Sequence, residues 1–342
     1  AMEEELNEDD FKEWEEKIEY RDILTYKQMV DNLELKRRCG PKPIKQGYGA
    51  IGRYNVTQRY VPHSGKGERD IYIHLPENKG KLFPLIFFAP GKNTRANKYR
   101  EMLFHIASHG NVILSSSFIH GVFKKDRDRY HALNEGFDIG IDLVRGLIDT
   151  SRIGFIGHAY GAKAILSSAW KYLSEKKWGN TISFLYLMSP SNFDSIDRLY
   201  TKRLPNTINS IVLVFDDDAI NKWDQAKELF YALPGKVSQK LFMIGHSYQS
   251  RRCEIDADHK APYCDERDDD DFNCIDEHII LRSIDALVEC SFKNNTSTFE
   301  NIIVSDRKSG QYNYTFQGRT WRAITISKDP NKLPHRKTFE LD

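Results

Sequence analysis

Apolar and polar residues follow two different patterns along the middle of the chain. Residues 52–61 and 69–75 alternate in polarity, which predicts two half-buried strands, whereas 83–89 is continuously apolar. A continuously apolar strand is typical of a sheet covered on both faces. Further strands are predicted at 111–117, 150–156, 182–188, 211–215 and 240–244, with helices at 96–109, 131–148, 222–233 and 276–292. This alternation predicts an α/β fold with a mostly parallel sheet and helices on both faces.

The two flanking segments have other patterns. Residues 5–38 place apolar side chains near helical spacing among charged ones, which predicts an amphipathic helix that ends before Gly40-Pro41. After residue 292, short alternating stretches predict a small β-meander at 301–305, 312–317 and 320–327. We therefore expect an N-terminal helical extension, an α/β catalytic domain and a C-terminal β-rich extension packed on the core, over 1–46, 47–292 and 293–342.

Composition narrows the class of protein. The 342 residues carry a formal net charge of +1, so charge alone favours neither nucleic acid nor an anionic membrane as a partner. The longest apolar stretch, 82–90, is about half the ~20 residues that span a bilayer. We expect a soluble globular protein with no nucleic-acid partner and no transmembrane segment. Its oligomeric state is left open.

The string Gly157-His158-Ala159-Tyr160-Gly161 has the spacing of the G-x-S-x-G nucleophile elbow, with alanine in place of serine. In such an elbow the chain turns sharply from a strand into a helix, and the central side chain points into an active site. The flanking residues fit, since a predicted strand precedes the string and a small-residue helical pattern follows it. A chance glycine-rich turn in another α/β protein is the simpler alternative.

Acid and base candidates follow two later strands in the chain order that this chemistry uses. Strand 211–215 is followed by Asp216-Asp217-Asp218, and strand 240–244 by Gly245-His246. Of the three aspartates we expect Asp218 as the acid, because a turn a few residues beyond the strand is the usual acid position for this chemistry, whereas Asp216 would more easily cap the following helix or face solvent. We expect His246 as the base. Ser247 is rejected as a nucleophile, because no acid and histidine follow it in the expected order.

Two backbone N–H groups are needed to stabilise a developing oxyanion. We expect them from Tyr160, directly after the elbow residue, and from Lys92 in the loop after strand 83–89. Three apolar residues in strand-end loops suggest an acyl pocket: Phe118, Ile119 and Phe193.

These motifs resemble the α/β-hydrolase superfamily, and within it the cutinase-like polyester hydrolases, dienelactone hydrolases and platelet-activating-factor acetylhydrolases. The resemblance rests on the runs 90–95 and 106–112 and on 149–154 leading into the elbow, and it covers roughly 47–292. It implies an eight-stranded sheet, a Ser-His-Asp triad with serine expected at Ala159, and oxyanion amides at Lys92 and Tyr160. The chain departs from the family in three places. The elbow serine is missing, the second elbow glycine is followed by alanine (Gly161-Ala162) rather than by another glycine, and a long acidic insert follows His246.

Two functional hypotheses follow from Ala159. In the first, the parent protein is a carboxylic ester hydrolase acting through an acyl-enzyme, inactivated here by a serine-to-alanine change. In the second, the alanine is native and the protein is a pseudoenzyme or binding protein that keeps the pocket. Either one predicts a small-molecule or lipid-like acyl ligand, and the hydrolase mechanism requires no metal or organic cofactor. Ester, thioester, lactone and amide substrates remain alternatives.

Cysteines and sequons bear on the cellular compartment. Four of the five cysteines lie after residue 250, and pairing of Cys253 with Cys264, or of Cys274 with Cys290, is one possibility. Glycosylation sequons begin at Asn55, Asn294, Asn295 and Asn313. Together these features favour a secreted or secretory-pathway protein over a cytoplasmic one. The acidic run 265–271 raises calcium binding as an alternative to a solvated charge cluster.

Overall fold

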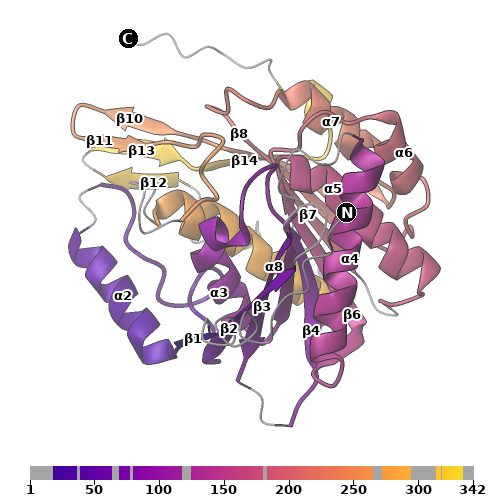
Figure 1. Ribbon diagram of the computed structural model, residues 1–342. Coiled ribbons are helices and arrows are strands. Elements are labelled where there is room, and N and C mark those ends of the chain that lie inside the picture. The colour runs from indigo at the N-terminus through magenta and orange to yellow at the C-terminus, as the bar shows by residue number, and fades with distance from the viewer. Residues whose placement is uncertain are drawn as a thin grey trace, which may run out of the picture.

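The protein folds around one ten-stranded sheet, seen in a computed structural model (Figure 1). The structure describes residues 18–36, 39–63, 69–77, 80–117, 125–179, 183–264, 272–293, 313–316 and 318–333. Strand order across the sheet is β1-β2-β3-β5-β4-β6-β7-β8-β9-β14. The five neighbouring pairs from β5 to β9 are parallel, and the remaining four are antiparallel. The predicted α/β architecture with a mostly parallel sheet is confirmed.

The strands of this sheet are short and mostly buried. Their bounds are β1 Ile18–Arg21, β2 Val56–His63, β3 Arg69–Pro76, β4 Phe83–Ala89, β5 Val112–Ser116, β6 Ile148–His158, β7 Phe184–Met188, β8 Asn209–Phe215, β9 Lys240–Gly245 and β14 Ile324–Ser327. Two small hairpins lie outside it, β10 Tyr248–Ser250 with β11 Cys253–Ile255, and β12 Asn313–Phe316 with β13 Arg319–Arg322. Strands β4, β5, β7 and β8 are buried along their whole length, which explains their largely apolar sequences.

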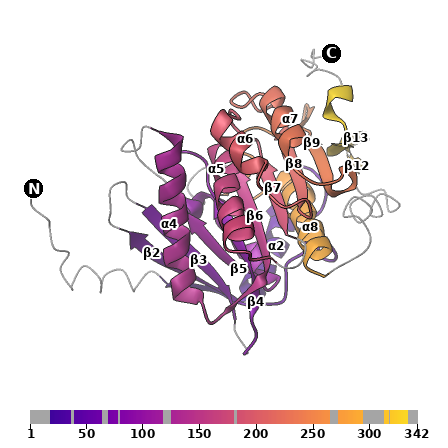
Figure 2. The ribbon, with the colours of Figure 1, turned by 90° about the vertical axis from the view of Figure 1, so that its right-hand side faces the viewer.

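Helices cover both faces of the sheet (Figures 1 and 2). Side chains of α3 and α8 share one buried cluster with β7 and β8, and side chains of α4, α5 and α7 share the other. The helices are α2 Ile23–Lys36, α3 Arg100–Ser108, α4 Asp126–Val144, α5 Tyr160–Ala169, α6 Ser195–Thr201, α7 Trp223–Ala232 and α8 Arg282–Phe292. A π-helical turn, Asp276–Leu281, leads into α8. Because strands β4 to β9 run parallel, their carboxyl ends lie together at one edge of the sheet. The elbow follows β6 and lies at that edge.

Two expectations about the flanking segments need correction, and two short elements of the middle domain were not predicted. Residues 18–21 form β1, an edge strand paired with β2, rather than part of the helix predicted over 5–38. In the C-terminal segment β12 and β13 form a hairpin, whereas β14 pairs with β9 and extends the main sheet instead of completing a meander. Helix α6 and the β10–β11 hairpin are not predicted by the pattern, because both are too short to show a period. The stretch 301–305 lies outside the described residues.

The N-terminal part of the chain is covalently joined to the loop after β9. Cys39 and Cys253 form a disulfide that spans 214 positions of sequence. The pairing of Cys253 with Cys264 is therefore wrong. So is that of Cys274 with Cys290, since both are buried thiols. Among the described residues, no helix is long and apolar enough to cross a membrane.

Candidate functional site

The turn between β6 and α5 has the geometry of a nucleophile elbow. Strand β6 ends at His158, α5 begins at Tyr160, and Ala159 between them has φ 52° and ψ −117°. A positive φ is costly for a residue with a Cβ, and such strain is often kept at functional sites. The flanking glycines are required by space, since a Cβ on Gly161 would lie 2.1 Å from the carbonyl oxygen of Ala89. A Cβ on Gly157 would lie 2.5 Å from that of Gly161.

Backbone hydrogen bonds hold Ala159 in this conformation. Its N–H donates to the Met188 carbonyl at 2.9 Å, and its carbonyl accepts from Ser191 N–H at 3.1 Å. Both partners come from the carboxyl end of β7, so the elbow is fixed to the neighbouring strand. The methyl group of alanine supplies neither a proton nor a nucleophilic atom. The site is thus rigidly built around a residue that has no chemistry of its own.

The structure brings Asp218 to a histidine other than the predicted one. Asp218 Oδ2 lies 3.0 Å from Nδ1 of His259, whose ring centroid is 4.9 Å from that of His158, the residue before Ala159. Asp218 Oδ1 accepts from the backbone N–H groups of Ile220 and Asn221. Burial raises the pKa of Asp218, but the hydrogen bond from His259 and these N–H groups outweigh it, and the net shift is downward. Asp218 is therefore a carboxylate that orients the His259 ring and leaves Nε2 on its far edge.

His246 belongs to a separate hydrogen-bonded group. Its Nδ1 lies 2.9 Å from Asp216 Oδ2 and its Nε2 lies 2.7 Å from Thr325 Oγ1 on β14. The His246 backbone also bonds to the residues before β14: its N–H donates to the Ala323 carbonyl, and its carbonyl accepts from the indole N–H of Trp321 on β13. Ser247 Oγ accepts the N–H of Ala257. This arrangement anchors edge strand β14, with Asp216 beside His246 where Asp218 was predicted.

The difference between the predicted and the observed pairing of Asp218 has a physical origin. We expected the base directly after β9, but β9 is followed by the β10–β11 hairpin, and the chain returns to the elbow only at His259. His259 is one of four histidines after Asp218 in the sequence, and it lies in the insert that we interpreted as an acidic loop. The order of acid before histidine was the one usable signal, and it fits His259 as well as His246.

The loop after β4 approaches the elbow through Tyr99. Gly91 N–H donates to the Tyr99 hydroxyl at 3.0 Å, and that hydroxyl lies 2.7 Å from His158 Nδ1. The Tyr99 hydroxyl, which accepts from Gly91, therefore also shares a hydrogen bond with the ring of His158. Full burial, with the nearby His259, lowers the pKa of His158 to about 3. A neutral histidine thus links the elbow to the predicted oxyanion loop.

The predicted oxyanion residues flank this link. Lys92 directly follows Gly91 in a turn closed by the hydrogen bond from Thr94 N–H to the Gly91 carbonyl. Tyr160 opens α5, so its N–H belongs to the first helical turn, where N–H groups face out of the helix end. The Tyr160 hydroxyl donates to Asp126 on α4, which turns this side chain toward α4. Both backbone positions remain candidates for stabilising negative charge.

An ion-pair cluster around the buried Lys163 holds the elbow helix in place. Lys163 Nζ lies 2.8 Å from carboxylate oxygens of Asp126 and of Asp194, and 3.9 Å from Asp197. Asp197 is fully buried, which raises its pKa to about 6, and it accepts from the Tyr130 hydroxyl at 2.6 Å. These contacts join α5 to α4 and α6, so the position of Ala159 depends on three helices.

The acyl-pocket residues are only partly described. Phe193 is buried in the core cluster that includes α5, which is a packing role. Phe118 and Ile119, like the acidic run 265–271, lie outside the described residues. A cavity of about 900 Å³ lies at the other end of the sheet, bordered by Phe83 at the start of β4 and Asn111 before β5. The elbow and this cavity are therefore separate features.

Comparison with known proteins gives no further guide. No protein-family model matches the chain, and no curated protein is significantly similar to it.

Proposed function

We propose that this is the site of a serine-type carboxylic ester hydrolase in which residue 159 is the nucleophile position, His259 the base and Asp218 its orienting acid. The observation that carries the proposal is the strained elbow at Ala159 beside the buried Asp218–His259 pair. Eight consecutive strands, β2 to β9, also match the sheet that the α/β-hydrolase resemblance implies. With alanine at 159 the chain is expected to bind acyl compounds without turning them over.

The geometry supports a definite sequence of proton transfers once serine stands at 159. His259 Nε2 takes the hydroxyl proton as Oγ bonds to the ester carbonyl carbon, and Asp218 stabilises the resulting imidazolium through Nδ1. The backbone N–H groups of Lys92 and Tyr160 stabilise the oxyanion. The alcohol leaves with the proton from His259, and water then releases the acid by the same steps in reverse roles. No metal or organic cofactor takes part.

The test is restoration of the hydroxyl. Ala159→Ser should react with a fluorophosphonate probe and hydrolyse p-nitrophenyl esters, while the alanine chain should do neither. Loss of a nucleophile alone costs on the order of a millionfold in turnover, so the contrast should be large. If the serine variant is folded by circular dichroism but neither labels nor turns over short and long acyl esters, the hydrolase proposal is wrong and a binding protein is the better account.

We also infer an oxidising compartment for the natural protein. The Cys39–Cys253 disulfide supports this, because disulfides persist mainly in secreted and lumenal proteins. Of the sequon asparagines, Asn55 bonds Glu77 and the Ile23 N–H through its side chain, which disfavours glycosylation there. Asn313 is exposed on β12 and is the better acceptor. Asn294 and Asn295 lie outside the described residues.

A further inference from the structure

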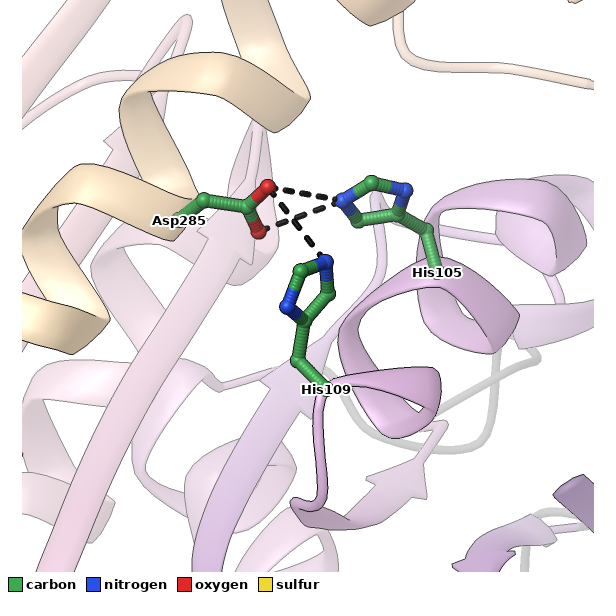
Figure 3. Close-up of side chains that lie close together, drawn as sticks. All are labelled: His105, His109 and Asp285. Atoms are coloured by element: carbon green, nitrogen blue, oxygen red, sulfur yellow. Dashed lines mark hydrogen bonds and ion pairs between the residues drawn. The ribbon is translucent and has the colours of Figure 1, made fainter. Parts of the chain in front are cut away.

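Two histidines and an aspartate meet far from the elbow, between α3 and α8 (Figure 3). His105 lies on α3, His109 directly follows its last residue, and Asp285 lies on α8. The spacing of four residues puts both imidazoles on one side of the helix. Among the described residues, their ligand atoms form one group within 4.8 Å.

The two distances from Asp285 to the imidazoles are close to those around a tetrahedral ion. Asp285 Oδ2 lies 3.0 Å from His105 Nε2 and 3.5 Å from His109 Nε2. Ligand bonds of 2.0–2.1 Å around tetrahedral zinc place neighbouring ligand atoms roughly 3.4 Å apart. A separation of 3.5 Å is too long for a good hydrogen bond, so the His109–Asp285 contact contributes little without an ion. We propose that His105, His109 and Asp285 bind a divalent transition metal, with Zn²⁺ the best match to two imidazoles and one carboxylate.

The surroundings favour a fixed site with one open position. The side chains of His105 and Asp285 are buried, at 1% and 7% exposure, and Gly49 N–H donates to Asp285 Oδ2 at 2.8 Å. His109 is more exposed, at 32%, and both it and Asp285 line the 900 Å³ cavity. An ion can therefore enter from the cavity, and water from it can supply the fourth ligand.

Binding has an identifiable local cost. His109 Nε2 lies 2.9 Å from the Ala50 carbonyl and His105 Nε2 lies 3.0 Å from the Asp285 carboxylate, so each nitrogen carries a proton that the ion must replace. Both hydrogen bonds are lost, and each proton moves to the other ring nitrogen or to solvent. In return the ion joins α3 to α8 at the end of the sheet opposite the elbow. Its role is thus structural, and the proposal does not depend on the hydrolase function.

Metal titration of the whole chain tests the site directly. Tag-free protein, cleared of metal with a chelator, should bind one Co²⁺ per chain with the intense visible bands of a four-coordinate ion, and Zn²⁺ should displace it. Saturating Zn²⁺ should raise the melting temperature by about 2–5 °C. His109→Gln should weaken Co²⁺ affinity at least about tenfold. It should stay folded, because this side chain is partly exposed.

The matched control is His131→Gln, which removes a surface histidine that faces Glu135 one helical turn away at 3.5 Å. It should keep the full affinity and stoichiometry. Absence of stoichiometric Co²⁺ binding, or binding that His109→Gln leaves unchanged, would overturn the proposal. Probe labelling of Ala159→Ser should be the same with and without chelator, so failure of the metal site and failure of the hydrolase proposal are separable.

Discussion

Ala159 has a positive φ, and the space around its neighbour Gly161 shows why the elbow accepts so few residue types. Gly161 lies against the carbonyls of Ala89 and Pro90, with no room for a methyl group. We predict that Gly161→Ala lowers the free energy of unfolding by about 1–3 kcal/mol or more, because backbone must move. Urea unfolding measures this. Gly146→Ala, where nothing lies within 4 Å of the added Cβ, should change stability by less than about 0.5 kcal/mol. Equal effects at the two sites would contradict the close approach at the elbow.

At the scale of elements, the position of α5 depends on Lys163 and the carboxylates of α4 and α6 around it. Removing the ammonium with Lys163→Met leaves Asp197 buried without its cation, and we predict a loss of about 3–5 kcal/mol in unfolding free energy. Arg145→Met removes an exposed pair with Asp142 and should cost less than about 1 kcal/mol. A Lys163→Met protein as stable as the Arg145→Met control would show that the cluster does not hold the helix.

Long helices and strands could be predicted from the sequence, whereas the shortest elements could not. Strands such as β4 and β8 are long enough and apolar enough for their pattern to predict them, and the elbow motif placed the turn between β6 and α5. The β10–β11 hairpin has three residues in each strand, so no period reveals it. Without that hairpin, the prediction placed the base directly after β9, at His246. The place of Asp218 at this end of the sheet could be predicted, because it lies only three residues beyond β8, where local sequence still fixes the direction of the chain.

For the whole molecule, buried neutral histidines predict an acid-sensitive fold. Burial lowers the pKa of His158 from 6.5 to about 3 in the folded protein. Between pH 6.5 and pH 3 the unfolded chain therefore binds a proton at this residue that the folded chain does not bind. Stability is therefore present above pH 6.5 and falls as pH decreases toward 3, by up to about 1.4 kcal/mol per pH unit. His74, also buried with a pKa of about 3, acts in the same direction.

Urea unfolding across this pH range checks the linkage. His158→Gln should be less stable near neutral pH but should show a shallower decline on acidification. The exposed His131→Gln should keep the slope of the parent chain. An unchanged slope in His158→Gln would mean that His158 is not held neutral.

The central claim is that His259, oriented by Asp218, is the base for the nucleophile position in the elbow, and that His246 is not. The most direct measurement is ester turnover in the Ala159→Ser background, comparing His259→Gln with His246→Gln, each a histidine paired to an aspartate. We predict that His259→Gln lowers kcat/KM by at least about 10⁴-fold, whereas His246→Gln changes it by less than about tenfold. A large loss in His246→Gln together with an active His259→Gln enzyme would contradict the account.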